Sequence, residues 1–127
     1  MGMFSAFEDL EVEQVWIRWS LRLIFDPGPP GSPGTFIDLT NLMFTDEEGC
    51  KSEVSIEQDP RTAAPMLGLL HHRVSAARVD HWELELAFDT GARLLCPPDP
   101  RFEAWTAHLP DHGMIYCPPG GGIGSPD

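Results

Sequence analysis

Apolar and polar side chains alternate along much of the chain, which predicts β-strands that are half buried. In one segment Trp19, Leu21, Leu23 and Phe25 occupy every second position, so they share one face of a strand. The same spacing recurs in residues 82–88, where charged side chains occupy the opposite face. Both segments therefore indicate strands with one face toward a core.

These two segments are copies of one another. WSLRLIFDPG at 19–28 and WELELAFDTG at 82–91 are identical at six of ten positions, with a constant offset of 63 residues. A shared β pattern requires apolar residues at these places but not the same ones. A Pro/Gly-rich loop (26–34) follows the first copy, and a tight Asp-Thr-Gly turn follows the second. The sequence predicts a duplicated hairpin, with Trp19 and Trp82 both in the core.

One short helix is predicted between the two halves, at about 60–70. Asp59 is a favoured N-cap, and Pro60 suits the first helical position, where its missing N–H has no helical partner. Pro65 limits the length of the helix. His71 and His72 would follow its last turn, where cations suit the helix dipole.

The remaining pattern completes a mostly β domain of the α+β class. Strand patterns occur in residues 35–44, 54–56, 74–79, 102–105 and 113–117. We expect an antiparallel sheet, sandwich or half-barrel, built from two repeated hairpins plus one short helix. A length of 127 residues predicts a single domain, 1–127, with repeat halves at about 10–44 and 73–96. The loop-like tail, 118–127, is expected to be mobile.

Net charge is the unusual bulk property. The chain has 20 acidic and 8 basic residues, a net charge of −12. Residues 1–60 hold 12 of the acids and 3 of the bases, a net −9. Such a charge repels phosphate backbones and anionic lipid, so neither nucleic acid nor a membrane is the expected partner. It would attract a basic protein partner, but it is also a common route to solubility, which is the interpretation that the charge alone favours.

The cysteines indicate a reducing, cytoplasmic location. Cys50, Cys96 and Cys117 are odd in number and form no C-x-x-C pair. The N-terminus shows no signal-peptide pattern, and the apolar runs are far too short to span a bilayer. Cys96 and Cys117 stand beside proline pairs without a nucleophile motif, so we expect no catalytic cysteine.

No metal site, cofactor or catalytic centre is expected. His108 and His112 have the i, i+4 spacing of helical metal ligands and precede Cys117, but a Leu-Pro-Asp turn separates the two histidines. Glu83 and Glu85 project from the same face of a strand, as a pair of catalytic carboxylates can. Any strand with one solvent-exposed face also has such residues.

The second half of the chain resembles a family of small, uncharacterised bacterial proteins. The resemblance rests on WELELAFDTG, CPPDPRFEAW and YCPPGGG, which fit a pattern of L-x-L-x-F-x-x-G, E-A-W and a closing P-G-G. It is clearest over residues 70–122, and it implies no activity. The chain departs from the pattern at its end, where GIGSPD replaces the expected hydrophobic ending.

The leading hypothesis is a non-catalytic binding protein, most plausibly an immunity protein that neutralises a basic bacterial toxin. Small acidic proteins of this style resemble immunity proteins as a class, and an acidic surface binds a basic toxin quickly through electrostatic steering. The expected binding residues are the acids grouped around Lys51 together with one semi-exposed aromatic residue: Asp46, Glu47, Glu48, Glu53, Glu57, Asp59 and Trp105.

Two alternatives stay open. One is a small-molecule-binding or enzymatic β-barrel with an apolar cavity lined by Trp19, Trp82 and Phe102. The other is a homodimeric structural module whose sheet edges pair between subunits.

Overall fold

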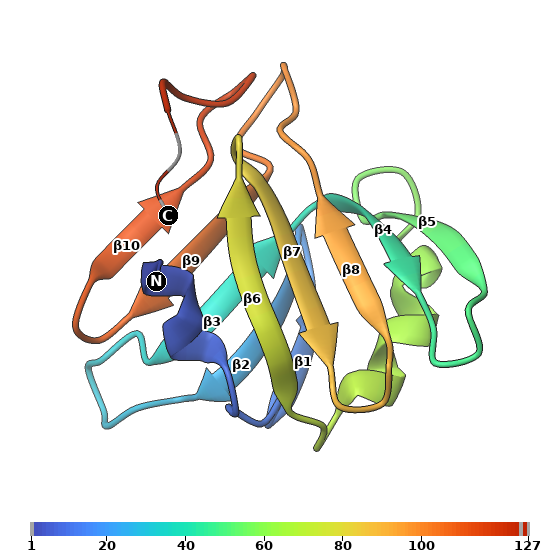
Figure 1. Cartoon of the computed structure of the whole chain (residues 1–127), viewed down its shortest axis with the longest axis horizontal. Coiled ribbons are helices and arrows are strands. Elements are labelled where there is room, and N and C mark those ends of the chain that lie inside the picture. Colours follow the sequence, from blue (N-terminus) through green and yellow to red (C-terminus); the bar gives the residue numbers. More distant parts are fainter. Residues whose placement is uncertain (1, 125, 127) are drawn as a thin grey trace.

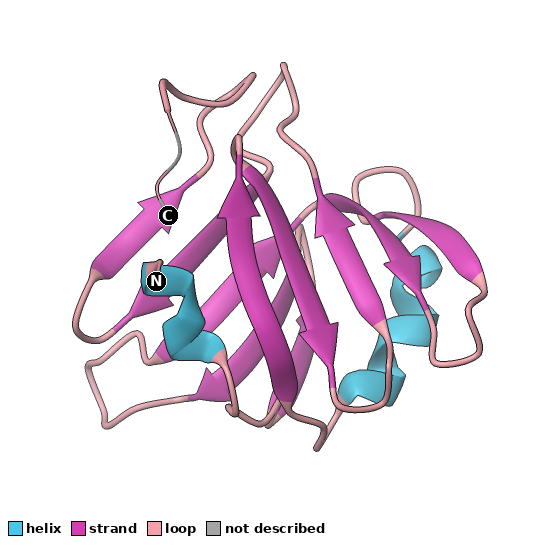
Figure 2. Cartoon of the chain, viewed as in Figure 1, coloured by secondary structure: helices cyan, strands magenta, loops and turns pink. Residues whose placement is uncertain are grey.

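The chain forms two antiparallel sheets of five strands each, ordered β1-β2-β3-β9-β10 and β5-β4-β8-β7-β6 (Figures 1 and 2). The structure is a computed structural model, and it describes residues 2–124 and 126. The strands are β1 (Gln14–Ile17), β2 (Leu21–Asp26), β3 (Thr35–Leu39), β4 (Asn41–Thr45), β5 (Lys51–Ser55), β6 (Val74–Asp80), β7 (Glu83–Phe88), β8 (Arg93–Cys96), β9 (Trp105–Leu109) and β10 (Gly113–Tyr116).

The two sheets pack face to face as a sandwich. In Figure 1, β6 and β7 cross in front of β2 and β3. The inward side chains of both sheets form a single hydrophobic cluster, in which Leu23 and Ile37 of one sheet and Leu86 and Leu94 of the other are fully buried. The predicted mostly β fold is confirmed. The predicted alternation holds in β7, whereas β2 buries Ile24 as well as Leu21, Leu23 and Phe25.

The duplication extends far beyond the two hairpins. Each half of the chain consists of a 3-10 helix followed by five strands: η1 (Met3–Phe7) precedes β1 to β5, and η2 (Pro60–Leu69) precedes β6 to β10. The first three strands of each half form an antiparallel meander. The last two strands join the sheet of the other half, because β3 pairs with β9 and β8 pairs with β4. The halves therefore exchange their final hairpins.

The strand register obeys the same duplication. Leu21 lies opposite Leu39 in the first half, and the equivalent Leu84 lies opposite Cys96 in the second. The hairpin equivalence predicted from the sequence thus holds at the level of individual residue pairs. The long Pro/Gly loop (27–34) and the tight turn after β7 occupy the same place in the two hairpins.

The pattern at 35–44, expected to form a single strand, belongs to two strands in different sheets. The chain leaves one sheet at Leu39 and enters the other at Asn41, with Thr40 between them. β3 buries every residue except Asp38, and β4 buries Leu42 and Phe44, so the buried apolar positions continue from one strand to the next without a visible break. The positions of the apolar residues indicate which side chains point inward. They do not indicate to which sheet a strand belongs, because a chain that crosses between two facing sheets still points its apolar side chains inward.

The predicted helix forms as η2, and it is a 3-10 helix. Asp59 caps it as expected, because its carboxylate accepts the Arg61 backbone N–H at 3.0 Å. Pro65 donates no backbone hydrogen bond in the middle of the helix, which disfavours a regular α-helix. The buried Met66 and Leu69 fix the helix to the core. The shorter η1, which the pattern did not indicate, buries its two phenylalanines.

The equivalence of Trp19 and Trp82 fails, and the expectation that Trp19 lies in the core is wrong. Trp82 packs against the core, whereas Trp19 is 88% exposed. The turns explain the difference. Only His81 and Trp82 separate the paired ends of β6 and β7, and both have positive φ (51° and 67°), whereas three residues separate the paired Ile17 and Leu21. The extra residue changes the direction of the Trp19 ring.

The C-terminal segment contacts Trp82. The Gly120 N–H donates to the Asp99 carbonyl at 2.7 Å. Gly122 lies so close to the Trp82 ring that an added Cβ would come within 2.7 Å of it. Of the tail that was predicted to be mobile, positions 125 and 127 lie outside the described residues, and the mobility stays a prediction.

Replacing His81 should stabilise the protein, because a left-handed backbone is unfavourable for histidine and is common for asparagine in such turns. We predict that His81→Asn raises the free energy of unfolding by about 0.5 kcal/mol, measured by urea denaturation. The exposed contact between His81 and Asp80 (2.9 Å) contributes little that would be lost. An unchanged or lower stability would contradict this account of the turn.

Candidate functional site

The six acids predicted to bind a partner lie along the β4–β5 hairpin and the segment that follows it. Asp46, Glu47 and Glu48 form the turn, Glu53 projects from β5, and the other two precede η2. Glu47, Glu48 and Glu53 are exposed, whereas Asp46 is half buried. The hairpin therefore brings together only part of the predicted set.

Asp46 has a structural role in the turn. One oxygen of its carboxylate accepts the backbone N–H groups of Glu48 and Cys50, each at 2.9 Å. Aspartate commonly stabilises a turn in this way. Its neighbours Glu47 and Glu48 are thereby held at the tip, pointing outward.

The two acids before η2 are paired with arginines. The Glu57 carboxylate accepts a hydrogen bond from Arg101 at 3.0 Å. The Asp59 carboxylate accepts from the Arg61 side chain at 3.0 Å, and this hydrogen bond lowers the pKa of Asp59 below its ordinary value. These arginines reduce the negative charge at this end of the predicted surface. Arg101 lies 44 residues from Glu57 in sequence, so local reasoning missed this pair.

Three glutamates remain without a cationic partner among the described residues, namely Glu47, Glu48 and Glu53. Lys51 is the one basic residue within their hairpin. The strand that holds Glu53 is the edge strand β5, so the hairpin is open to solvent along one side. We call this group the acidic hairpin.

The tip of the acidic hairpin adjoins a further carboxylate. A small hollow of about 140 Å³ is lined by Asp46 and Glu47 from the tip, by His72 after η2 and by Thr90 from the β7–β8 turn. The neighbouring Asp89 contacts His72 at 3.1 Å. The tip of the acidic hairpin and the β7–β8 turn thus border the same hollow, and His72 in its lining also contacts Asp89.

The predicted semi-exposed position of Trp105 is wrong, because this residue is only 1% exposed. Its ring stacks on Trp82 (centroids 6.2 Å apart) and meets Phe4 edge-on at 5.4 Å. Its indole N–H donates to the Trp82 carbonyl at 3.0 Å. Trp105 begins β9, and it occupies the place that the buried Leu42 has in β4. That equivalence lies outside the part of the repeat that the sequence reveals.

Two of the exposed aromatic residues, Trp16 and Trp19, lie on the β1–β2 hairpin instead, and Tyr116 is exposed on β10. Trp16 is 45% exposed and Ile17 is 37% exposed, and both neighbour the more exposed Trp19. Sequence reasoning missed this patch because it assigned Trp19 to the core by analogy with Trp82. The one-residue difference in turn length was visible only once the strand pairing was known.

Trp19 and Phe102 line a surface hollow of about 450 Å³ with Thr40, Ile56 and Pro60. The β-barrel alternative predicted a cavity that Trp82 also lines. Trp82 does not line this hollow and packs instead on Trp105. The hollow opens at the surface of the described structure, beside the core.

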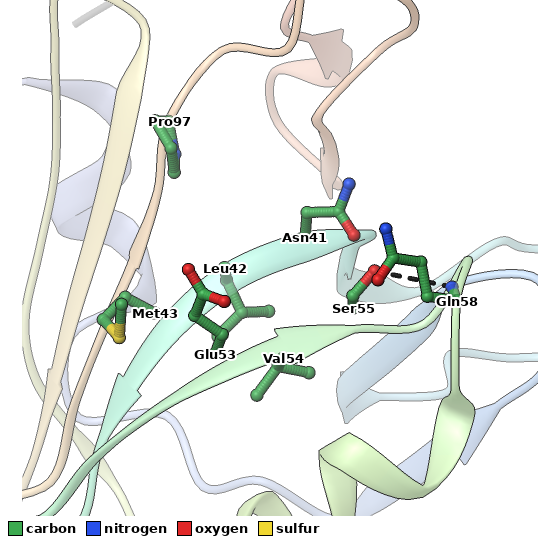
Figure 3. Close-up of a pocket in the computed structure, with 8 residues that line it drawn as sticks. All are labelled: Asn41, Leu42, Met43, Glu53, Val54, Ser55, Gln58 and Pro97. Carbon is green, nitrogen blue, oxygen red and sulfur yellow. Dashed lines mark hydrogen bonds between the residues drawn. The ribbon is translucent and has the colours of Figure 1, made fainter.

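A second hollow, of about 330 Å³, lies over β4 and β5 (Figure 3). The side chains of Asn41, Ser55 and Gln58 gather at one end of it, and the Glu53 carboxylate lies toward Met43. The Asn41 side-chain oxygen is buried and accepts no hydrogen bond within the described structure. This unpaired acceptor at the end of the hollow is a feature that favours a small ligand with a hydrogen-bond donor.

The cysteines and the C-terminal histidines occupy separate environments. Burial raises the pKa of the Cys96 and Cys117 thiols, and Cys50 is exposed. The His108 ring contacts the Gly34 carbonyl and stacks on Phe36, so it closes the Pro/Gly loop onto the sheet. In the part of the chain that the structure describes, no three His, Cys, Asp or Glu side chains gather as a metal site.

Glu85 is held by two arginines on the outer face of its sheet. Burial alone would raise the pKa of Glu85, but hydrogen bonds from Arg78 (2.6 Å) and Arg93 bring it below its ordinary value. This pairing links β6, β7 and β8 through side chains. Glu83, two residues away, is exposed and has no such partner among the described residues.

Removing the Glu85 charge should destabilise the protein in a pH-dependent way. A carboxyl whose pKa is lowered by folding contributes stability above its unfolded pKa and loses it as pH falls through the folded value. We predict that Glu85→Gln lowers the free energy of unfolding by about 1 kcal/mol at pH 7. The loss should fade below pH 4.5, the ordinary value for glutamate.

Urea denaturation at several pH values measures this effect, and Glu83→Gln is the matched control on the same strand. The control should change stability little at any pH. An equal loss for both variants, or a loss for Glu85→Gln that persists at pH 3, would contradict the pairing as its cause.

Comparison with known proteins gives one match. The sequence fits the model of a family of unknown function (DUF6188) over residues 3–126. The resemblance predicted from short motifs in residues 70–122 is thus confirmed and covers nearly the whole chain. No curated protein and no solved structure matches the chain. The described residues contain no helix that is both long enough and apolar enough to cross a membrane.

Proposed function

The chain belongs to the family of unknown function DUF6188, and from its own surface we propose that it is a non-catalytic protein that binds a basic protein partner. The observation that carries the proposal is the acidic hairpin. Its glutamates Glu47, Glu48 and Glu53 project from one open-edged hairpin without an arginine to neutralise them. An immunity protein bound to a basic toxin is the form of this function that we favour.

Electrostatics supports such a role. The chain carries a net charge of −12, and an acidic surface attracts a basic protein over roughly a Debye length, about 8 Å at physiological salt. Complementary charge raises the rate of association and favours one partner over others. The same charge disfavours nucleic acid and anionic lipid, so we propose a protein partner in a reducing cytoplasm.

The shape of the hairpin also supports binding. Asp46 holds the turn through two backbone hydrogen bonds, so the adjacent glutamates are presented on an ordered tip. A preorganised surface loses less conformational entropy when a partner binds. The two predicted residues that pair with arginines, Glu57 and Asp59, are less available, and Trp105 is buried.

A charge-matched comparison tests the surface. We predict that Glu47→Gln, Glu48→Gln and Glu53→Gln together weaken binding of a fluorescent deca-lysine peptide about tenfold at low salt, because three exposed ion pairs are lost. The matched control changes three exposed glutamates elsewhere, Glu13, Glu83 and Glu103, and gives the same net charge. Fluorescence anisotropy measures both. Equal weakening by the two triple variants would show that overall charge, and not this hairpin, is responsible.

The biological role requires a second experiment. The protein encoded by the neighbouring gene is produced in cells with this chain or with the hairpin triple variant. If that protein is a basic toxin, this chain should restore growth and the variant should restore it less. Full protection by the triple variant would contradict the acidic hairpin as the binding surface.

A further inference from the structure

The hollow beside Trp19 corresponds to the place that Trp82 fills in the other half. Trp82 lies against Gly121 and Gly122, which follow β10, and Pro98, which follows β8, also lies beside Gly121. The hollow is lined by residues that follow the equivalent strands β3 and β5. These are Thr40, Ile56 and Glu57. One half thus has an indole seated at the end of the sandwich, and the other half has an open hollow.

Trp19 lies at the rim of this hollow without filling it. Its side chain is 88% exposed, although it lines the hollow with Phe102 and Pro60. Trp82 reaches its seat through a two-residue turn and a positive φ of 67°. Trp19 is the middle residue of a three-residue turn and does not have a positive φ. The Trp19 ring is therefore held at the rim of its own hollow and does not occupy it as Trp82 occupies the equivalent place.

We propose that the chain forms a twofold dimer in which Trp19 of each copy enters the hollow of the other. An exposed aromatic ring beside a hollow lined by apolar side chains can bind a second copy of the same surface. A twofold interface requires such a self-complementary surface. In the other half of the chain, the equivalent position holds the indole ring of Trp82. An exposed tryptophan that becomes buried at the centre of an interface is a frequent source of binding energy.

The charges around the hollow favour a second copy over a basic partner. Glu57, which lines the hollow, is paired with Arg101 at 3.0 Å. Asp38, two residues before the lining Thr40, is paired with Arg22 at 2.7 Å. Arg18 also lines the hollow and adds a positive charge. These three arginines outnumber the two acids, although the chain as a whole has a net charge of −12. Two copies can therefore approach here without the repulsion that the acidic hairpin would produce.

This dimer is independent of the proposed function and differs from a dimer formed by pairing of sheet edges. It buries side chains of the β1–β2 turn and leaves the acidic hairpin of each copy exposed. The two proposals fail separately, because the hairpin triple variant should dimerise as the unchanged protein does.

Sedimentation equilibrium of the full chain from 1 to 200 µM tests the proposal. The unchanged protein should form dimers, and Trp19→Ser should weaken dimerisation at least about a hundredfold, because two buried indoles are lost per dimer. Tyr116→Ser is the control, since Tyr116 is 49% exposed at the opposite edge of the same sheet. The proposal is overturned if the unchanged protein is monomeric at 200 µM, or if Trp19→Ser dimerises equally well.

A second variant tests the hollow without changing Trp19. Glu57→Trp places a bulky ring over the hollow and should also weaken dimerisation. Tryptophan fluorescence distinguishes a Trp19 ring that enters the hollow of the other copy from one that enters the hollow of its own chain. Subtracting the emission spectrum of Trp19→Phe from that of the unchanged protein gives the contribution of Trp19. The maximum of this difference spectrum should shift to shorter wavelength as the protein concentration rises. A short-wavelength difference that does not depend on concentration would mean that Trp19 enters its own hollow, and the dimer proposal would be wrong.

Discussion

The structure depends on the exchange of the final hairpin between the two halves. The β3–β9 and β4–β8 pairings complete both sheets, so each sheet takes three strands from one half and two from the other. Both sheets contribute to one core. Neither half can bury its inward side chains without the other, and this long-range pairing fixes where every surface residue lies.

The two halves of the chain share one fold, so the places where they differ indicate residues that the fold itself does not require. The β4–β5 hairpin carries the unpaired glutamates, whereas the equivalent β9–β10 turn carries Pro110, Asp111 and His112. The glycine-rich segment after β10 lets Trp82 lie flat against the backbone, while η2 begins in the equivalent place of the first half. Both proposed binding surfaces therefore lie where the halves diverge, and the shared residues serve the core.

The sequence predicted the positions of the strands and the helix better than it predicted which strands pair with one another. Alternation identified the buried faces of β2 and β7, and Asp59-Pro60 marked the start of η2, because both properties are local. Trp19 and Trp105 were misplaced because their positions depend on turn length and on strand pairing across the duplication. Similarly, the charge of Glu57 is offset by an arginine that only the folded chain brings near. Distant pairing leaves no trace in local periodicity.

Fragment complementation tests the exchange most directly. Residues 1–57 and 58–127 are produced separately, so that each fragment holds one complete half. Circular dichroism and urea denaturation should show that neither fragment alone has a cooperative unfolding transition, and that an equimolar mixture regains one. A cooperative transition in either isolated fragment would contradict the claim that the two halves form their sheets only together.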